Sequence, residues 1–253
     1  MKSRSLVRAL LLAAAMSPSA HPAETRDPKA VAAAERTIAA MGGAPAFAAL
    51  RKLSFDWIVD RGGKEVARYH HEWDRWSGAY VVEGKNREGH VIRTEFNVND
   101  RKGRSWKDGA LLEGKELEAA LESAYGRYIN DSYWLVMPAK LFDPGVNLAW
   151  EGEASGAGAT GDAGAAYDVI RVTFSGVGLT PKDTYWAYCD PTTGLMTRWD
   201  FLLQDSETDK RSTFLWGDWR DVGAPPAKVK LAMRKTAPGG GAVIRFENVR
   251  GEP

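Results

Sequence analysis

The sequence is poor in residues that carry sulfur chemistry. Cys189 is its only cysteine, so the chain cannot form an internal disulfide. It lies within TYWAYCDP, an aromatic run typical of a strand, and we predict a small buried side chain there and not a nucleophile. Without a disulfide, the stability of the fold must come from a hydrophobic core.

An excess of charge of either sign is also missing. The 34 Lys and Arg residues are balanced by 33 Asp and Glu residues, which leaves a net charge of +1. A chain without a dominant charge creates no long-range field that would concentrate it on nucleic acid or on an anionic membrane. We therefore expect no nucleic-acid partner.

The N-terminal region lacks an apolar run long enough to cross a membrane. Ala9–Met16 is apolar, but it is far shorter than the ~20 residues that a span needs. Basic residues precede it and the small-residue stretch SPSAHPA follows, which is the order typical of a secretory signal. We predict that residues 1–23 are a signal peptide, cleaved after Ala20 or Ala23. Residues 24–253 would then be a single periplasmic domain.

Short motifs that mark many enzymes and metalloproteins are absent. The sequence contains no GxSxG, HExxH, Walker loop or dinucleotide-binding glycine pattern. His70 and His71 are adjacent, but neighbouring residues of a strand point to opposite faces, so they cannot jointly hold one metal ion. We expect no metal and no cofactor. We place His71 in the core beside Tyr69 and Trp73, and His70 in water.

Alternation of apolar and polar residues, by contrast, is abundant. Leu53, Phe55 and Trp57 alternate with polar residues, which is typical of a half-buried strand. Similar runs recur to the end of the chain, and Asp190–Gly194 predicts the turn of a hairpin. We expect an α+β fold in which about ten antiparallel strands form a curved half-barrel and helices cover its concave face.

Helical signals occur in two places. Asp27 followed by Pro28 predicts a helix to about Met41, with Val31 on its buried face. Lys115–Tyr128 has helical periodicity, and Asn130–Ser132 predict the cap of a short second turn. The run YWLVMPAKLFDPGVNL then continues to a type II turn at Asp-Pro-Gly.

A signal peptide, an N-terminal helix, a long antiparallel meander, a central helical insert and the DPxTGL hairpin at Asp190–Leu195 together resemble the LolA and LolB superfamily of lipoprotein carriers. Three sequence elements resemble those of its uncharacterised exported members. They are NDSYWL (Asn130–Leu135), MPxKLxDPGV (Met137–Val146) and LTPxDTYWxYxDPxTGL (Leu179–Leu195). The sequence is most similar to uncharacterised exported members, over most of the mature chain. The resemblance implies a half-barrel that holds an apolar ligand, in the carriers the acyl chains of lipoproteins, beneath covering helices. No lipobox cysteine follows the apolar run, which departs from LolB and implies a soluble form more like LolA.

Ten tryptophans are the most unusual part of the composition. Buried aromatic side chains either fill a core or line a cavity for an apolar ligand, and both interpretations stay open. Lys140 and Asp143 are likewise either an anchor for a ligand head group or a solvated pair. The residues that we predict to contact a ligand are Trp57, Trp73, Phe96, Tyr133, Trp134, Met137, Leu141 and Trp186.

Together these features predict a monomeric, non-enzymatic periplasmic protein. Its ligand would be apolar or amphipathic, such as a lipid or a lipidated protein, and an envelope protein is a candidate partner. The alternatives are a hydrolase-like enzyme that uses a cavity residue, and a solidly packed envelope protein that acts through protein contacts. Polar groups with perturbed pKa values inside a cavity would favour the enzyme, and a dense interior would favour the envelope protein.

Overall fold

The protein is described by a computed structural model over residues 24–155 and 166–253, so the predicted signal peptide lies outside the described residues. The helices are α1 (Pro28–Ala40), α2 (Ala44–Ala49) and α3 (Gly114–Val136), with a short 3-10 helix η1 (Met137–Lys140). The strands are β1 (Lys52–Arg61), β2 (Lys64–Asp74), β3 (Ala79–Lys85), β4 (Val91–Asn97), β5 (Gly103–Lys107), β6 (Ala110–Leu111), β7 (Val146–Ser155), β8 (Ala166–Phe174), β9 (Thr184–Cys189), β10 (Met196–Leu202), β11 (Ser212–Val222), β12 (Val229–Thr236) and β13 (Val243–Glu252).

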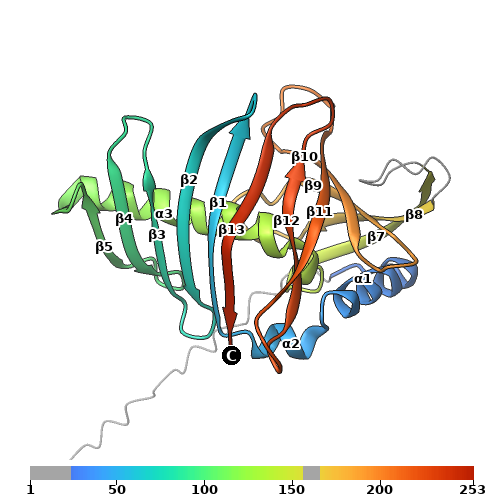
Figure 1. Cartoon of the computed structure of the whole chain (residues 1–253). Coiled ribbons are helices and arrows are strands. Elements are labelled where there is room, and N and C mark those ends of the chain that lie inside the picture. The colour runs from blue at the N-terminus through green and yellow to red at the C-terminus, as the bar shows by residue number, and fades with distance from the viewer. Residues whose placement is uncertain (1–23, 156–165) are drawn as a thin grey trace, which may run out of the picture.

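All thirteen strands of the described residues belong to one antiparallel sheet. Its order is β6-β5-β4-β3-β2-β1-β13-β12-β11-β10-β9-β8-β7, so the sheet stays open, with β6 and β7 at its edges (Figure 1). The α+β class and the antiparallel sheet are confirmed, but the expected number of about ten strands is wrong. Strands β5 and β6 have only 5 and 2 residues, which is too short for an alternating pattern.

Helix α3 crosses the strands on one side of the sheet (Figure 1) and contacts β3, β4, β5 and β12. The expected break before Asn130–Ser132 is wrong, because α3 is one continuous helix of 23 residues. The polar side chains that favour caps are satisfied inside the helix instead. Ser132 Oγ donates to the Tyr128 carbonyl at 2.6 Å, and Asn130 Nδ2 donates to Asp131 Oδ1 at 2.7 Å.

Helix α1 begins at the predicted residue. The Asp27 carboxylate accepts hydrogen bonds from backbone N–H groups of the first turn, as an N-cap should. The buried face consists largely of Ala30, Ala33 and Ala34, whereas Val31 is only partly buried. Small side chains let the helix approach β7 and β8 closely.

The main hydrophobic core lies between the sheet and the helices. It contains side chains from α1, α2, β1, the C-terminal end of α3, η1 and most of strands β7–β13. Cys189 is buried in it, as predicted, and burial raises the pKa of its thiol to about 11. Within the described residues no helix has the length and apolarity that a transmembrane segment needs.

Candidate functional site

A cavity of about 600 Å³ lies between helix α3 and the half of the sheet that ends in β7. We call it the α3 cavity. Its walls come from the C-terminal half of α3, the Asp143–Gly145 turn, the segment Val177–Thr180 and strands β8–β10. The aromatic side chains that line it are Trp73, Tyr128, Tyr133, Trp134, Phe174, Tyr185, Trp199 and Phe201.

The aromatic walls are built from rings that contact one another edge to face. Trp134 of α3 lies 4.6 Å from Trp199 and 4.9 Å from Phe214, measured between ring centroids. Tyr185 lies 5.1 Å from Trp199 and 5.2 Å from Phe174. Such contacts hold the rings in fixed orientations. The cavity therefore has an ordered apolar wall.

Two leucines mark the mouth of the cavity. Leu179 lies after β8 and is 50% exposed, and Leu203 lies after β10 and is 47% exposed. Both line the α3 cavity. They therefore extend its apolar surface from the interior out to solvent.

Asp183 fixes the loop beside this mouth. Its side chain is almost fully buried and accepts hydrogen bonds from Thr180 Oγ1 at 2.7 Å, Tyr185 Oη at 2.9 Å and the Gln204 backbone N–H at 2.8 Å. Three bonds satisfy a buried carboxylate and join the loops before β9 and after β10. Burial, with the nearby Asp183 charge, raises the pKa of Tyr185, so this phenol stays neutral.

Few charged groups reach the cavity. Lys140 and Asp143 form an ion pair with each other at its edge. Burial raises the pKa of Tyr133 well above its usual value, so that hydroxyl is neutral too. The site can accommodate an apolar ligand more readily than a free ion.

The residues predicted to contact a ligand are distributed unevenly. Trp73, Tyr133 and Trp134 line the α3 cavity. Met137 and Leu141 are almost fully buried in the main core. Ligand contact by any of these residues stays a prediction.

The other three predicted contact residues lie away from the cavity. The Arg127 guanidinium lies over Trp57, with its central carbon 5.3 Å from the Trp57 ring centroid. Phe96 packs edge-on against Tyr80. Trp186 belongs to a small separate cluster of β8 and β9. Their roles as ligand contacts also stay predictions.

Several cavity residues were missed from the sequence. Tyr185, Trp199 and Phe201 lie in strongly aromatic strands, and their spacing shows that Trp199 and Phe201 share a face. Strand spacing does not say which face lies under α3. Leu179 and Leu203 lie outside strands and had no periodic signal.

A buried polar cluster lies beside the cavity, between the sheet and α3. His71 of β2 and Asp131 of α3 are both 0% exposed, and Tyr80 of β3 is 1% exposed. Tyr80 Oη lies 2.9 Å from His71 Nδ1. His71 Nε2 lies 3.3 Å from Asp131 Oδ2 without an aligned hydrogen bond. Arg127 Nη1 also lies 3.3 Å from Asp131 Oδ2 and donates to it.

His71 was predicted to be a packing residue, but it also makes polar contacts. Its ring does stack on Phe55, with centroids 4.7 Å apart. Its two nitrogens nevertheless face Tyr80 and Asp131, from another strand and a helix. Burial lowers the pKa of His71 although Asp131 opposes this, so the imidazole is neutral at neutral pH.

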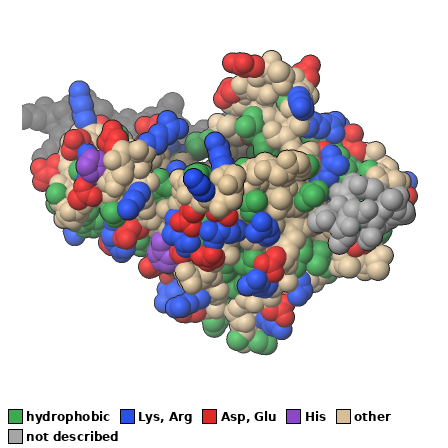
Figure 2. All heavy atoms as spheres, turned by 45° about the horizontal axis from the view of Figure 1, so that its top comes forward, with side chains coloured by type: hydrophobic (Ala, Val, Ile, Leu, Met, Phe, Trp, Pro, Cys, Tyr) green, Lys and Arg blue, Asp and Glu red, His purple; other side chains and the backbone are tan. Residues whose placement is uncertain are grey.

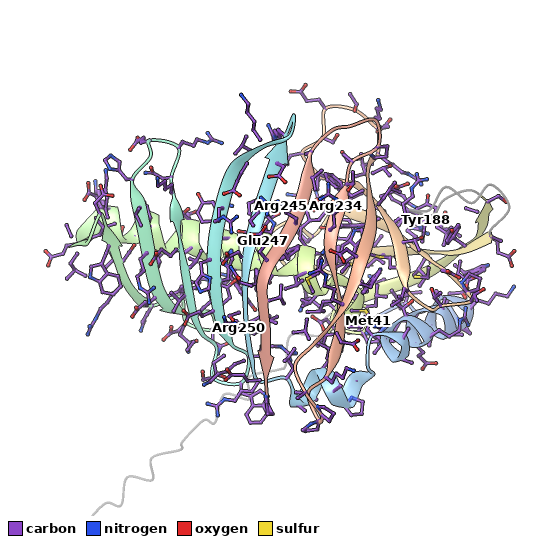
Figure 3. The ribbon with its side chains drawn as sticks, viewed as in Figure 1. Met41, Tyr188, Arg234, Arg245, Glu247 and Arg250 are labelled. Atoms are coloured by element: carbon purple, nitrogen blue, oxygen red, sulfur yellow. The ribbon has the colours of Figure 1, made fainter. Side chains whose placement is uncertain are left out.

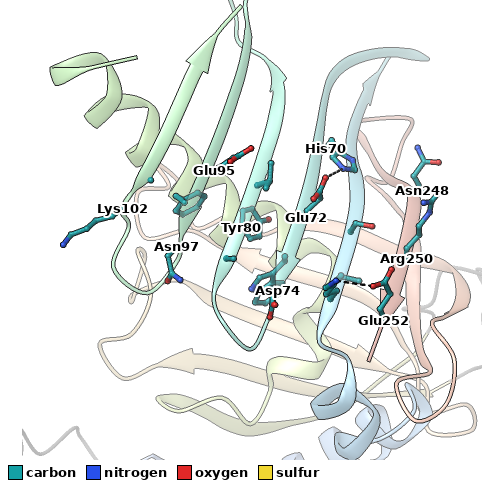
Figure 4. Close-up of a pocket in the computed structure, with 18 residues that line it drawn as sticks. His70, Glu72, Asp74, Tyr80, Glu95, Asn97, Lys102, Asn248, Arg250 and Glu252 are labelled. Carbon is teal, nitrogen blue, oxygen red and sulfur yellow. Dashed lines mark ion pairs between the residues drawn. The ribbon is translucent and has the colours of Figure 1, made fainter. Parts of the chain in front are cut away.

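The opposite face of the sheet is hollowed but polar. A hollow of about 1010 Å³ lies over β1–β4 and β13 (Figure 4). Several of its charged side chains are paired, with His70 Nε2 3.4 Å from Glu72 Oε1 and Lys52 Nζ 3.7 Å from Glu252 Oε2. His70 is therefore on the exposed face, as predicted. This hollow lacks the apolar wall of the α3 cavity.

Further ion pairs join strands β1, β2 and β13. Arg245 of β13 lies beside Glu247 (Figure 3) and donates to Asp60 Oδ2 at 2.7 Å and to Glu65 Oε2 at 2.8 Å. In the surface view, basic and acidic side chains are intermixed (Figure 2). Within the described residues no cluster of three or more His, Cys, Asp and Glu could hold a metal ion.

An open antiparallel sheet, a helix laid across it and an apolar cavity between them define the structural class of this chain. No protein-family model matches its sequence, and no curated protein matches it. Among solved structures, the chain is similar at low sequence identity to proteins that include LolA superfamily and DUF1329 family members.

Three of these structures show the degree of similarity. A DUF1329 family protein from Desulfovibrio piger is 10% identical, with a TM-score of 0.48, over 88% of this chain and 93% of that one. A LolA superfamily protein from Nitrosomonas europaea is 8% identical, with a TM-score of 0.48, over 88% and 94%. A putative outer membrane lipoprotein-sorting protein domain from Vibrio parahaemolyticus is 9% identical, with a TM-score of 0.46, over 88% and 92%. Likeness at this level says nothing about the ligand.

Proposed function

We propose that the protein is a non-enzymatic periplasmic protein that binds an apolar or amphipathic ligand, such as a lipid or a lipidated protein, in the α3 cavity. The observation that carries this proposal is the aromatic wall between α3 and strands β8–β10. A volume of about 600 Å³ falls in the range of ~300–1,000 Å³ that is usual for small-molecule sites.

The driving force would be removal of apolar surface from water. Each buried methylene contributes about 0.8 kcal/mol, so part of one acyl chain suffices for useful affinity. The exposed leucines of the mouth, Leu179 and Leu203, supply a first apolar contact for an incoming chain. An envelope protein that delivers or receives the ligand would dock at this mouth, with the carrier acting as a monomer.

An enzymatic role has less support from the cavity. Its carboxylates already have partners, because Asp183 accepts three hydrogen bonds and Asp143 pairs with Lys140. The thiol of Cys189 is buried in the core with a raised pKa. A nucleophile or a general base needs a reactive group facing the substrate.

The test compares two leucines of similar exposure. Leu203→Asp puts a carboxylate at the mouth, whereas Leu111→Asp puts one on edge strand β6, away from the α3 cavity. The probe is N-phenyl-1-naphthylamine, a neutral apolar dye that fluoresces on entering an apolar site. We expect the Leu203 variant to bind it at least about tenfold more weakly, and the Leu111 variant to bind like the wild type. Equal affinity in all three proteins would contradict binding in this cavity.

A further inference from the structure

We propose that His71, Tyr80 and Asp131 form a latch that holds helix α3 on the sheet at neutral pH and loosens in acid, so that the α3 cavity opens. The part of this inference that concerns ligand release rests on the proposed function. The mechanical part, the loosening of α3, stands by itself.

The latch joins three different elements. His71 comes from β2, Tyr80 from β3 and Asp131 from α3. All three side chains are buried, in a region where the remaining contacts between α3 and the sheet are mainly apolar. A buried polar contact of this kind has one favourable arrangement and is disrupted by a change in protonation.

The same turn of α3 forms part of the cavity wall. Asn130, Ser132 and Tyr133 line the α3 cavity, and Asp131 lies between them in sequence. Asn130 also donates a hydrogen bond to Asp131 at 2.7 Å. A shift of Asp131 away from His71 would therefore move the cavity wall.

Hydrogen bonding explains why the latch requires a neutral imidazole. If the buried Tyr80 hydroxyl donates to Nδ1 at 2.9 Å, the proton of the neutral ring must be on Nε2, which lies 3.3 Å from Asp131 Oδ2 without an aligned hydrogen bond. A second proton on Nδ1 would turn the acceptor into a donor. The Tyr80 hydroxyl, which is buried, would then have to accept, and its own proton would lose its partner.

The charges around His71 do not compensate for this loss. Asp131 faces it from α3, but Arg127 and Asn130 already donate to that carboxylate. Arg127 also disfavours a positive charge on the His71 ring, as does His70 on the same strand. Strand β1 contributes only the apolar ring of Phe55.

Proton linkage gives the direction of the switch. Burial lowers the pKa of His71 while α3 is closed, and lifting the helix would hydrate the imidazole and return its pKa toward ~6.5. The open form binds the proton more readily, so the equilibrium constant for opening rises as the pH falls below that value. One proton allows an increase of up to about tenfold per pH unit.

The test is hydrogen–deuterium exchange of the full mature protein between pH 8 and pH 5, with labelling times corrected for intrinsic exchange. In the wild type we expect exchange of α3 to rise at least about tenfold relative to strands β11–β13. His90→Gln is the matched control, because His90 is an exposed histidine paired with Asp108 in the β4–β5 region. It should behave like the wild type, and His71→Gln should lose the dependence on pH.

Unchanged exchange of α3 in the wild type, or the same acid response in His71→Gln, would overturn the latch. If His71→Gln fails to fold, NMR titration of the wild-type His71 ring decides instead. Its midpoint must coincide with that of α3 exchange, and separate midpoints would overturn the proposal. Retention of N-phenyl-1-naphthylamine at pH 5 is measured in parallel. If the dye binds at no pH, the proposed function fails while the exchange data still test the latch.

Discussion

Lys235 is a single basic side chain enclosed by the core. It is 0% exposed, and its Nζ donates to the Ala232 carbonyl at 2.6 Å. Nζ also lies 4.4 Å from the Trp216 ring centroid and 4.2 Å from that of Phe246. No carboxylate among the described residues forms an ion pair with it. Burial therefore lowers the pKa of Lys235 well below its ordinary value.

Replacing this amine should stabilise the protein. Because the pKa of Lys235 is lower in the folded protein than in the unfolded chain, the unfolded chain binds the proton more readily, and the contribution of this group to the free energy of unfolding rises with pH up to ~10.4. We expect Lys235→Met to raise that free energy at pH 7 by about 0.5–2 kcal/mol, with a smaller gain at pH 9.5. Urea denaturation at the two pH values measures both quantities. A less stable Met variant at pH 7 would mean that the aromatic rings hold a charged ammonium.

His70 and His71 show what residue-level inference from sequence could achieve. Their opposite orientations followed from strand geometry alone, and the structure confirms them. The partners of His71 did not follow, because Asp131 lies 60 positions further along the chain and was interpreted as part of a helix cap. A polar residue that favours caps tells nothing of a buried partner on another element.

At the scale of elements, the turn after η1 connects the cavity wall to the rest of the molecule. The sequence predicted a turn at Asp143–Gly145, and Gly145 has the positive φ of 82° that such a turn requires. Its N–H donates to Glu24 Oε1 at 2.7 Å, and its carbonyl accepts from the Ser175 N–H at 2.8 Å. The turn therefore ties together three segments that are distant in sequence.

Gly145→Ala should disturb the turn and the neighbouring loop. A Cβ at this position would lie 2.6 Å from Val177 Cγ1, whereas a Cβ at Gly176, whose φ is 71°, would meet nothing within 4 Å. Positive φ alone costs about 1–3 kcal/mol in each variant. We expect Gly145→Ala to lower the free energy of unfolding by about 1 kcal/mol more than Gly176→Ala and to weaken dye binding. If urea denaturation shows that both variants lose the same free energy of unfolding, the Val177 side chain moves aside without a measurable loss of stability.

At the scale of the whole molecule, the periodicity of the strands predicted the class of fold. It could not predict the number of strands, because β5 and β6 depend on pairing with β4 and with each other. Nor could it decide between a core and a cavity. The predicted contact residues fall into both, since Met137 is in the core and Trp134 borders core and cavity alike. That division depends on where α3 lies on the sheet.

The central claim is that the α3 cavity holds an apolar ligand in the cell envelope. The most direct test is native mass spectrometry of the protein, purified gently from an envelope extract, followed by solvent extraction of the bound material. We predict a reproducible adduct of lipid mass, which is lost in Leu203→Asp and retained in Leu111→Asp. A bare mass that stays unchanged after incubation with lipids and lipopeptides would contradict the claim.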